Sequence, residues 1–350
     1  MTEPLRSRID QLTNETIPLL RQDPWPQAEH RFTKASLWAL DMATETGRPL
    51  LIRGEPGIGK SQIARAAAAV LKVPFLSFVV NERTERDDLL FHYDAVARLA
   101  AIQVPRPTAS GRSDNGITGL PQSLQESSFI RPGILWWALN WNTARDQAEL
   151  FSTYCRPCPE PCAQPASRSR EKPLCGPVVL IDEIDKADPS VPNGLLECLG
   201  TDGFRSPLLP QSVSLSESGL RPLIILTTNE ERELPPAFLR RCLVITIAFP
   251  KTDQEATRFL MEERVRPRFN ESEISDEVCH KVIAELLAER AIAQQGQVEG
   301  VYGPGAAEFL DIVTALVTIG ATVHAKKRAA EQLRALKEIQ RFALVKTLQD

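Results

Sequence analysis

The residues of this chain best suited to chemistry are three closely spaced glycines followed by a lysine and a serine. Positions 54–61 read GEPGIGKS, which fits the pattern G-x-x-x-x-G-K-[ST] of phosphate-binding loops. Gly57 and Gly59 can adopt backbone angles that a side chain would forbid, so consecutive N–H groups can turn toward one anion. The residues that we expect to contact a nucleotide are Gly54, Glu55, Pro56, Gly57, Ile58, Gly59, Lys60, Ser61 and Gln62.

The segments on either side of this loop supply the setting that the motif needs. PLLIR before it predicts a short buried strand, and SQIARAAAAVLK after it predicts a helix whose positive dipole end attracts an anion. We expect Lys60 to reach the β- and γ-phosphates of ATP and the Ser61 hydroxyl to hold Mg²⁺. The alternative is a glycine-rich turn without a ligand, which the complete motif in this setting disfavours.

Two acidic residues stand at the end of another apolar run. In VVLIDEID, Asp182 and Glu183 follow a predicted strand, and ligands of open α/β sheets bind at the carboxyl ends of strands. We expect Asp182 to lie near the Mg²⁺ held by Ser61, and Glu183 to activate a water for attack on the γ-phosphate. An acidic pair after a strand is usually a solvated corner, but beside a phosphate-binding loop the catalytic role is favoured.

Two further polar positions follow the same logic, and each has an ordinary alternative. Asn229 ends the run ILTTN and could hydrogen-bond the γ-phosphate or the attacking water, although a turn asparagine is common by itself. Arg240 and Arg241 in LPPAFLRRC could stabilise the charge of phosphoryl transfer across a subunit interface. Taken alone, two adjacent arginines are more often a solvated surface pair.

Composition narrows the class of protein. The 350 residues are 43% hydrophobic and 25% charged, which is ordinary for a globular protein, and the formal net charge is −4. This charge disfavours a broad nucleic-acid surface. No apolar run approaches the length of a membrane span. The first residues lack the apolar core of a signal peptide, so we expect the seven cysteines to lie in a reducing cytoplasm.

Five short apolar runs predict the fold. Each is rich in β-branched residues, and helical patterns separate them, which is typical of parallel strands buried on both faces. The sequence therefore predicts an α/β phosphate-binding-loop core with a five-stranded parallel sheet, followed by an all-helical lid domain. The predicted strands are Leu50–Arg53, Pro74–Val80, Pro177–Glu183, Pro222–Asn229 and Cys242–Phe249.

The domain organisation follows from these patterns. We expect an N-terminal arm at 1–30, an α/β core at 31–250, and a helical lid with a C-terminal helix at 251–350. Loop-like insertions are expected at about 100–125 and 150–176, with a single helix between them over RPGILWWALNWNTARDQAEL.

In this order the motifs resemble the AAA+ ATPases, and within them the MoxR and dynein-related (AAA_5) branch. The similar segments are GEPGIGKS, LIDEIDKAD, TTNEERELPPAFLRRC and IAFP. The resemblance implies that positions 54–61 are the Walker A loop, that Asp182 and Glu183 are the Walker B pair, and that Asn229 is sensor 1. Arg240 and Arg241 become the arginine-finger candidates, and which of them acts stays open. The family further implies a homo-oligomeric ring, usually hexameric.

The sequence departs from this family in the lid. Many relatives carry an arginine, sensor 2, at the start of a lid helix, but the matching stretch YGPGAAEFLDIV (Tyr302–Val313) has none. Its lack of an arginine resembles a sub-branch associated with von Willebrand A-domain partners and bacterial conflict systems. How the lid senses the nucleotide is therefore left open.

A cysteine group and the histidines carry weaker signals. Four thiolates could hold a structural Zn²⁺, but the spacings x2, x3 and x12 are not those of a paired zinc site, and reduced thiols in a loop are favoured. The four histidines are isolated, and we assign them no catalytic role. The cysteines concerned are Cys155, Cys158, Cys162 and Cys175.

Together these features predict a MoxR-type ATPase that couples ATP binding and hydrolysis to remodelling of a protein partner. One alternative is a nucleotide-gated assembly or sensor module of a defence system that hydrolyses ATP slowly. Another is a nucleic-acid-linked motor, which the acidic net charge disfavours.

Overall fold

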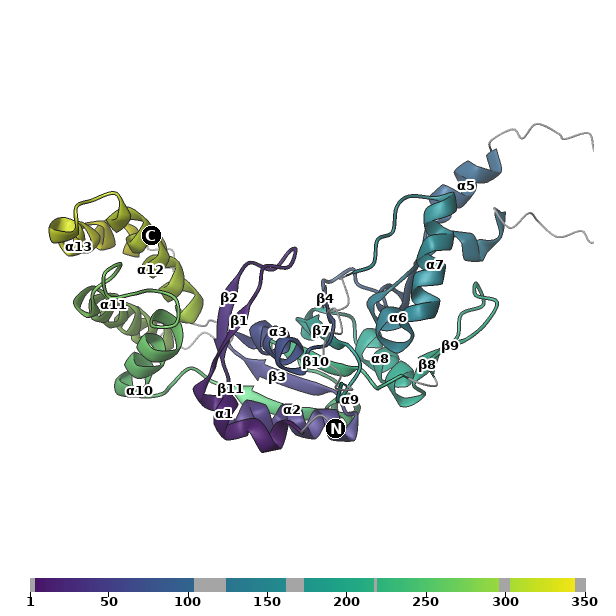
Figure 1. The fold of residues 1–350 in the computed structure, drawn as a ribbon, viewed down its shortest axis with the longest axis horizontal. Coiled ribbons are helices and arrows are strands. Elements are labelled where there is room, and N and C mark those ends of the chain that lie inside the picture. The colour runs from purple at the N-terminus through teal and green to yellow at the C-terminus, as the bar shows by residue number, and fades with distance from the viewer. Residues whose placement is uncertain (1–3, 104–123, 162–172, 217–218, 296–302, 344–350) are drawn as a thin grey trace, which may run out of the picture.

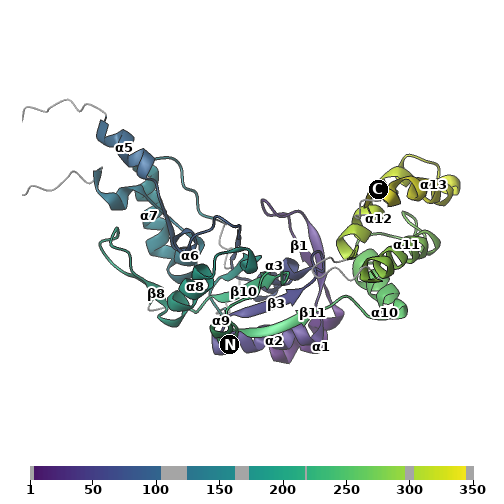
Figure 2. The same cartoon turned by 180° about the vertical axis from the view of Figure 1, so that it is seen from behind.

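The computed structural model describes residues 4–103, 124–161, 173–216, 219–295 and 303–343. A central parallel sheet occupies the middle of the molecule, with helices α10–α13 at one end and helices α5–α7 at the other (Figures 1 and 2).

The central sheet confirms the five predicted strands. All of its pairs are parallel, and the order is β11-β3-β10-β7-β4. Because the strands are parallel, their carboxyl ends meet at one edge, where the predicted phosphate-binding loop follows β3. The bounds are β3 Leu50–Gly54, β4 Phe75–Val79, β7 Val178–Asp182, β10 Leu223–Thr228 and β11 Leu243–Ile247.

The apolar runs of these strands are explained by burial on both faces. In β7, Val178 and Leu180 belong to one hydrophobic cluster, whereas Val179 and Ile181 belong to another. All four side chains are fully buried. Successive side chains of a strand point to opposite faces, so a strand with helices on both sides needs an unbroken apolar sequence.

The segment 4–31 packs tightly against the core. The segment predicted as an arm forms a 3₁₀ turn and a short helix, followed by a hairpin of two strands. Leu5, Ile9 and Leu12 are buried in the same cluster as the helices α2 and α3. The elements are the 3₁₀ turn Leu5–Arg8, α1 Ile9–Asn14, β1 Thr16–Leu19, β2 Ala28–Arg31, α2 Lys34–Thr46 and α3 Lys60–Leu71.

The region between β4 and β7 contains one prediction that was wrong. The single helix expected over RPGILWWALNWNTARDQAEL is two helices, α6 Ile134–Leu139 and α7 Trp141–Tyr154. Asn140 breaks them with φ −148°, and its side chain accepts a hydrogen bond from the N–H of Thr143 at 3.2 Å. An asparagine that caps the second helix competes with continuation of the first. Residues 104–123, most of the first predicted insertion, and residues 162–172, part of the second, lie outside the described part.

The remaining elements of the core are short. They are α4 Arg86–Leu90, β5 Phe91–Tyr93, α5 Ala95–Gln103, the 3₁₀ turn Glu126–Phe129, β6 Ile130–Pro132, the 3₁₀ turn Ile184–Lys186, α8 Ser190–Gly200, β8 Gly203–Phe204, β9 Val213–Ser214 and α9 Pro236–Arg241.

The helical lid has a hydrophobic core of its own, and that core includes one residue of the phosphate-binding loop. Ile58 is 3% exposed and packs with Leu260, Phe309 and their neighbours. The lid is therefore in direct apolar contact with the loop. Its elements are α10 Asp253–Arg258, the π-helical segment Phe259–Val265, α11 Asp276–Gln295, α12 Ala306–Ala321 and α13 Ala325–Ala343.

Trp25 ties the N-terminal segment to the sheet. Its ring lies edge-on to Phe75 with 6.1 Å between centroids, and its Nε1 donates to Ser77 Oγ at 3.0 Å. The guanidinium of Arg65, in α3, lies 5.5 Å from the ring centroid.

We expect Trp25→Ala to lower the free energy of unfolding by about 2 kcal/mol, below the range for a fully buried Trp because this ring is partly exposed. Trp25→Phe keeps an aromatic ring at this place and should lose about 1 kcal/mol, mostly through the missing hydrogen bond. Denaturant titration of the two variants beside wild type measures both values. Equal stability of all three proteins would contradict the anchoring role.

Candidate active site

The predicted phosphate-binding loop joins β3 to α3. Gly57 and Gly59 have φ of 74° and 97°, conformations that side chains disfavour. Helix α3 begins at Lys60, so the first N–H groups of this helix have no partners within it. The loop and the helix start together present backbone donors to an anion, as the motif predicts. Gln62 lies half-buried in the first turn of the same helix.

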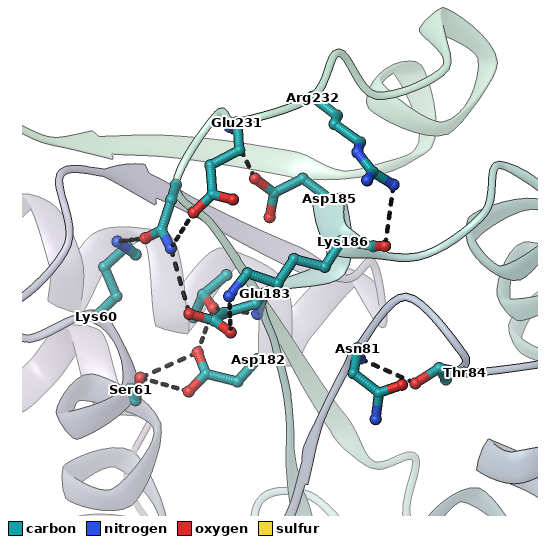
Figure 3. A network of polar contacts seen from close by, with 12 residues as sticks. Lys60, Ser61, Asn81, Thr84, Asp182, Glu183, Asp185, Lys186, Glu231 and Arg232 are labelled. Carbon is teal, nitrogen blue, oxygen red and sulfur yellow. Dashed lines mark hydrogen bonds and ion pairs between the residues drawn. The ribbon is translucent and has the colours of Figure 1, made fainter. Parts of the chain in front are cut away.

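Lys60 is the buried cation of this site. Its Nζ donates to the carbonyl oxygens of Gly54 at 2.6 Å and Glu55 at 2.9 Å, and to Asn229 Oδ1 at 2.6 Å. Burial lowers the pKa of its ammonium group, and four nearby carboxylates, of which Asp182 has the largest effect, oppose that shift. The lysine thus links the loop to the end of β10 (Figure 3).

Ser61 and Asp182 meet as the motif analysis expects. Ser61 Oγ lies 3.0 and 2.9 Å from the two carboxylate oxygens of Asp182. Thr227 Oγ1 also donates to this carboxylate. Hydroxyl and carboxylate oxygens are ligands that Mg²⁺ accepts, and Mg²⁺ commonly takes only one or two of them from protein. The residues present fit a magnesium ion bound together with phosphate oxygens.

Glu183 occupies a sharp turn directly after β7. Its φ of 61° is uncommon for a residue with a side chain and costs on the order of 1 kcal/mol or more. Its Oε2 pairs with Lys186 Nζ at 2.8 Å, and its Oε1 accepts from Asn229 Nδ2 at 3.3 Å. The strained turn places a carboxylate beside both Asp182 and Asn229 (Figure 3).

Asn229 connects the two halves of the site. It is 6% exposed, and its Oδ1 accepts from Lys60 while its Nδ2 donates to Glu183 and to Glu231 Oε1 at 3.4 Å. A single amide therefore orients the lysine and the predicted catalytic carboxylate. The structure brings together Lys60, Ser61, Asp182, Glu183 and Asn229, which the sequence placed in one site.

Sequence reasoning assigned no role to two residues at this edge. Asp185 is 2% exposed; its Oδ2 accepts from the N–H of Glu231 at 2.9 Å, and its Oδ1 has no partner among the described residues. Thr227 supports Asp182 and accepts the backbone N–H of Glu183 at 3.0 Å. Both lie inside motifs that the sequence had singled out, but their contacts depend on the pairing of β7 with β10.

Arg240 and Arg241 lie away from this cluster in the same chain. They end α9, which leads into the amino end of β11. Their backbone carbonyl groups accept from Arg48, which precedes β3. The amino ends of these parallel strands lie at the opposite edge of the sheet from the phosphate-binding loop. Both arginine side chains are exposed, which leaves them accessible to a second subunit.

Two lid arginines reach the loop, although neither stands in the stretch Tyr302–Val313. Arg264 donates to the carbonyl oxygen of Ile58 at 2.9 Å, and burial lowers its pKa to about 10. Arg290 donates to both carboxylate oxygens of Glu55. No local sequence signal marks these two, because both depend on how the lid folds back on the core.

The three described cysteines of the group, Cys155, Cys158 and Cys175, are not placed together for a zinc ion. Cys175 is buried in one hydrophobic cluster, and Cys158 packs against another. Burial raises the pKa of Cys175 to about 12, which disfavours the thiolate that zinc binds. Cys162 lies outside the described residues, and the described ones contain no set of three His, Cys, Asp or Glu side chains placed for a metal ion.

The phosphate-binding loop lies in the part of the chain that matches a known protein family. A family model described as an AAA domain of the dynein-related subfamily matches residues 49–112. This match covers β3, the phosphate-binding loop, α3 and β4. No curated protein matches the chain.

One of the matching solved structures is that of a candidate ATPase from Cytophaga hutchinsonii. It shares 14% identity, covers 89% of this chain and 80% of its own, and has a TM-score of 0.36. Similarity at this level carries no functional argument.

In the described part of the chain, no helix has both the length and the apolar character needed to cross a membrane.

His30 lies in β2 and supports a pH-dependent prediction. Its side chain is 6% exposed, and burial, followed by the charges of Arg264 and Arg268, lowers its pKa to about 3. As the pH falls, the imidazole of His30 therefore takes up a proton in the unfolded chain before it does so in the folded protein. Protonation of the unfolded chain below pH 6.5 lowers the free energy of unfolding. The contribution of His30 to that free energy is therefore fully present above pH 6.5 and is lost as the pH falls.

From pH 7.5 to 5.5 we expect wild type to lose about 1.4 kcal/mol through this residue. His30→Leu should lose correspondingly less over the same interval. Denaturant unfolding of both proteins at the two pH values measures the difference. Parallel pH profiles would show that His30 is not a buried neutral imidazole.

Proposed function

We propose that this chain is an ATP hydrolase, an AAA+ ATPase of the MoxR type, that couples ATP binding and hydrolysis to remodelling of a protein partner. The observation that carries the proposal is the network joining Lys60, Asn229 and Glu183 beside the pair Ser61 and Asp182. It combines a phosphate-binding cation, oxygen ligands for Mg²⁺ and a carboxylate positioned by an amide. These are the parts that phosphoryl transfer requires.

Each residue has a distinct task in this mechanism. The loop amides and Lys60 bind the β- and γ-phosphates, and Ser61 and Asp182 would hold Mg²⁺, which neutralises phosphate charge when bound. Glu183 accepts a proton from the attacking water, and Asn229 orients that water through the amide that already contacts Glu183. Lys186 holds the Glu183 carboxylate in this structure and must release it before it acts as a base.

Assembly supplies what a single chain lacks. Arg240 and Arg241 lie at the edge of the sheet opposite the loop, so we place them against the nucleotide of a neighbouring subunit in a ring, hexameric as in the family. The protein partner follows from the resemblance alone, and a von Willebrand A-domain protein is our candidate. We place the protein in the cytoplasm.

A slowly hydrolysing, nucleotide-gated module is the second candidate. The specific observations that favour it are the lack of an arginine in the stretch Tyr302–Val313 and the ion pair that occupies Glu183. The two functions differ in turnover, so one experiment separates them. A nucleic-acid-linked motor is the third candidate, and the net charge of −4 disfavours it.

Lys60→Ala should weaken ATP binding by tenfold or more, and Glu183→Gln should bind ATP normally but lower the hydrolysis rate about 10²-fold or more. Phosphate release and nucleotide titration measure the two effects. Lys72→Ala, at the far end of α3, and the exposed Glu233→Gln are matched controls that should behave as wild type.

Equal binding by wild type and Lys60→Ala would remove the proposed nucleotide site. Normal binding with equal, negligible turnover in wild type and Glu183→Gln would instead favour the gated module.

Arg240→Ala combined with Arg241→Ala should leave ATP binding intact and lower hydrolysis by tenfold or more, because developing phosphate charge loses its partner. Mixing this double variant with Lys60→Ala should restore part of the activity, since one variant supplies the site and the other supplies the arginines. Hydrolysis measured at several mixing ratios tests this. Absence of complementation in a mixed assembly would exclude action across the interface.

A further inference from the structure

Arg290 makes an ion pair between the lid and the phosphate-binding loop. Its Nη2 lies 2.6 Å from both Oε1 and Oε2 of Glu55. The Arg290 side chain is 9% exposed and that of Glu55 is 22% exposed. Exposed ion pairs contribute little, but an ion pair withdrawn from water must be well compensated, and removal of one partner is costly.

The surroundings of Arg290 supply that compensation. Its Nη1 donates to the carbonyl oxygens of Gly303 at 3.4 Å and Pro304 at 3.3 Å, just before α12. The guanidinium lies 4.2 Å from the ring centroid of Phe249, where the core leads into the lid. One side chain of α11 thus joins the loop, the start of α12 and the core–lid connection.

Other lid atoms lie directly on the loop. A Cβ placed on Gly57 would come within 2.6 Å of the Ala307 Cβ, so no room remains between them. A Cβ placed on Gly59 would lie 3.4 Å from Arg264 Nη2. The same nitrogen donates a hydrogen bond to the carbonyl oxygen of Ile58. The lid therefore contacts Gly57 and Gly59, two residues of the loop whose N–H groups we expect to bind phosphate.

We propose that Glu55 and Arg290 form a latch that holds the lid against the phosphate-binding loop, and that Mg·ATP enters when this ion pair opens. The proposal rests on the proposed function, because it takes the triphosphate as the ligand. An arriving phosphate is repelled by Glu55 and attracted by Arg290. The nucleotide therefore favours transfer of the guanidinium from carboxylate to phosphate, which changes the position of the lid.

This assignment supplies a lid arginine where the sequence predicted none. The stretch Tyr302–Val313 has no arginine, but Arg290 approaches the loop from the preceding helix and donates to the carbonyl groups of Gly303 and Pro304 within that stretch. Because Arg290 is paired with a carboxylate of the loop, phosphate can replace that carboxylate as its partner. A response of the lid to nucleotide by this route does not require an arginine at the start of α12.

The test is the rate at which a fluorescent ATP analogue with Mg²⁺ associates with wild type and with Arg290→Gln. If the charge only attracted phosphate, its removal would slow association. A latch predicts the opposite sign: association about tenfold faster, because the uncovered loop is populated more often. Dissociation should also become faster, because the phosphate loses its arginine. The matched control is Arg258→Gln, at an exposed lid arginine that pairs with Glu262 four residues further along the chain.

Hydrogen exchange without nucleotide provides a second readout. Arg290→Gln should increase exchange at the start of α12, whereas Arg258→Gln should not. Glu55→Gln, which keeps the size of the side chain, should also give faster association and increased exchange at the start of α12. This variant replaces Arg290→Gln in the test if that protein fails to fold. Slower association with Arg290→Gln, or unchanged exchange in both latch variants, overturns the latch. Increased exchange in a protein that binds no nucleotide would instead reject the proposed function and retain the lid contact.

Discussion

A buried ammonium group must be surrounded by acceptors, and the site is organised around that requirement. Lys60 is 6% exposed and satisfies it with two carbonyl groups of its own loop and the amide oxygen of Asn229. Its acceptors lie at or directly after the carboxyl ends of β3 and β10, which are paired in the sheet. The register of these two strands therefore fixes the distance between the phosphate-binding loop and the amide that orients Glu183. A shift of either strand would take hydrogen-bond acceptors away from the buried ammonium group of Lys60, which is energetically costly.

Much of the fold could be predicted because the governing forces are local or periodic. The five strands read as apolar runs since both faces of the sheet are covered, and GEPGIGKS specifies its loop through glycines. Gly47 ends α2 in the left-handed conformation, which glycine adopts without steric cost. Asn140 was missed because the apolar pattern of GILWWALNW continues across it, whereas its capping bond depends on one side chain.

The site was predictable wherever a residue stands at the end of a strand, and it was not wherever contact requires the lid. Asp182, Glu183 and Asn229 follow strands, so strand pairing alone brings them to the loop. Arg264 and Arg290 stand on helical segments more than 200 positions from the loop residues Ile58 and Glu55 that they contact. Nothing in the helical periodicity around them distinguishes these arginines from solvated ones. The reach of the lid could be read only from its packing around Ile58.

Ile58 and Glu55 together explain why this loop and the lid act as one unit. Ile58 contributes an apolar contact that has no preferred direction and that a small rotation of the lid would preserve. Glu55 contributes an ionic contact, which depends strongly on distance and which phosphate can replace. A lid held by apolar contact alone would respond weakly to nucleotide. A lid held by charge alone would separate once the charge was satisfied elsewhere. The combination allows the lid to change position on the loop without leaving it.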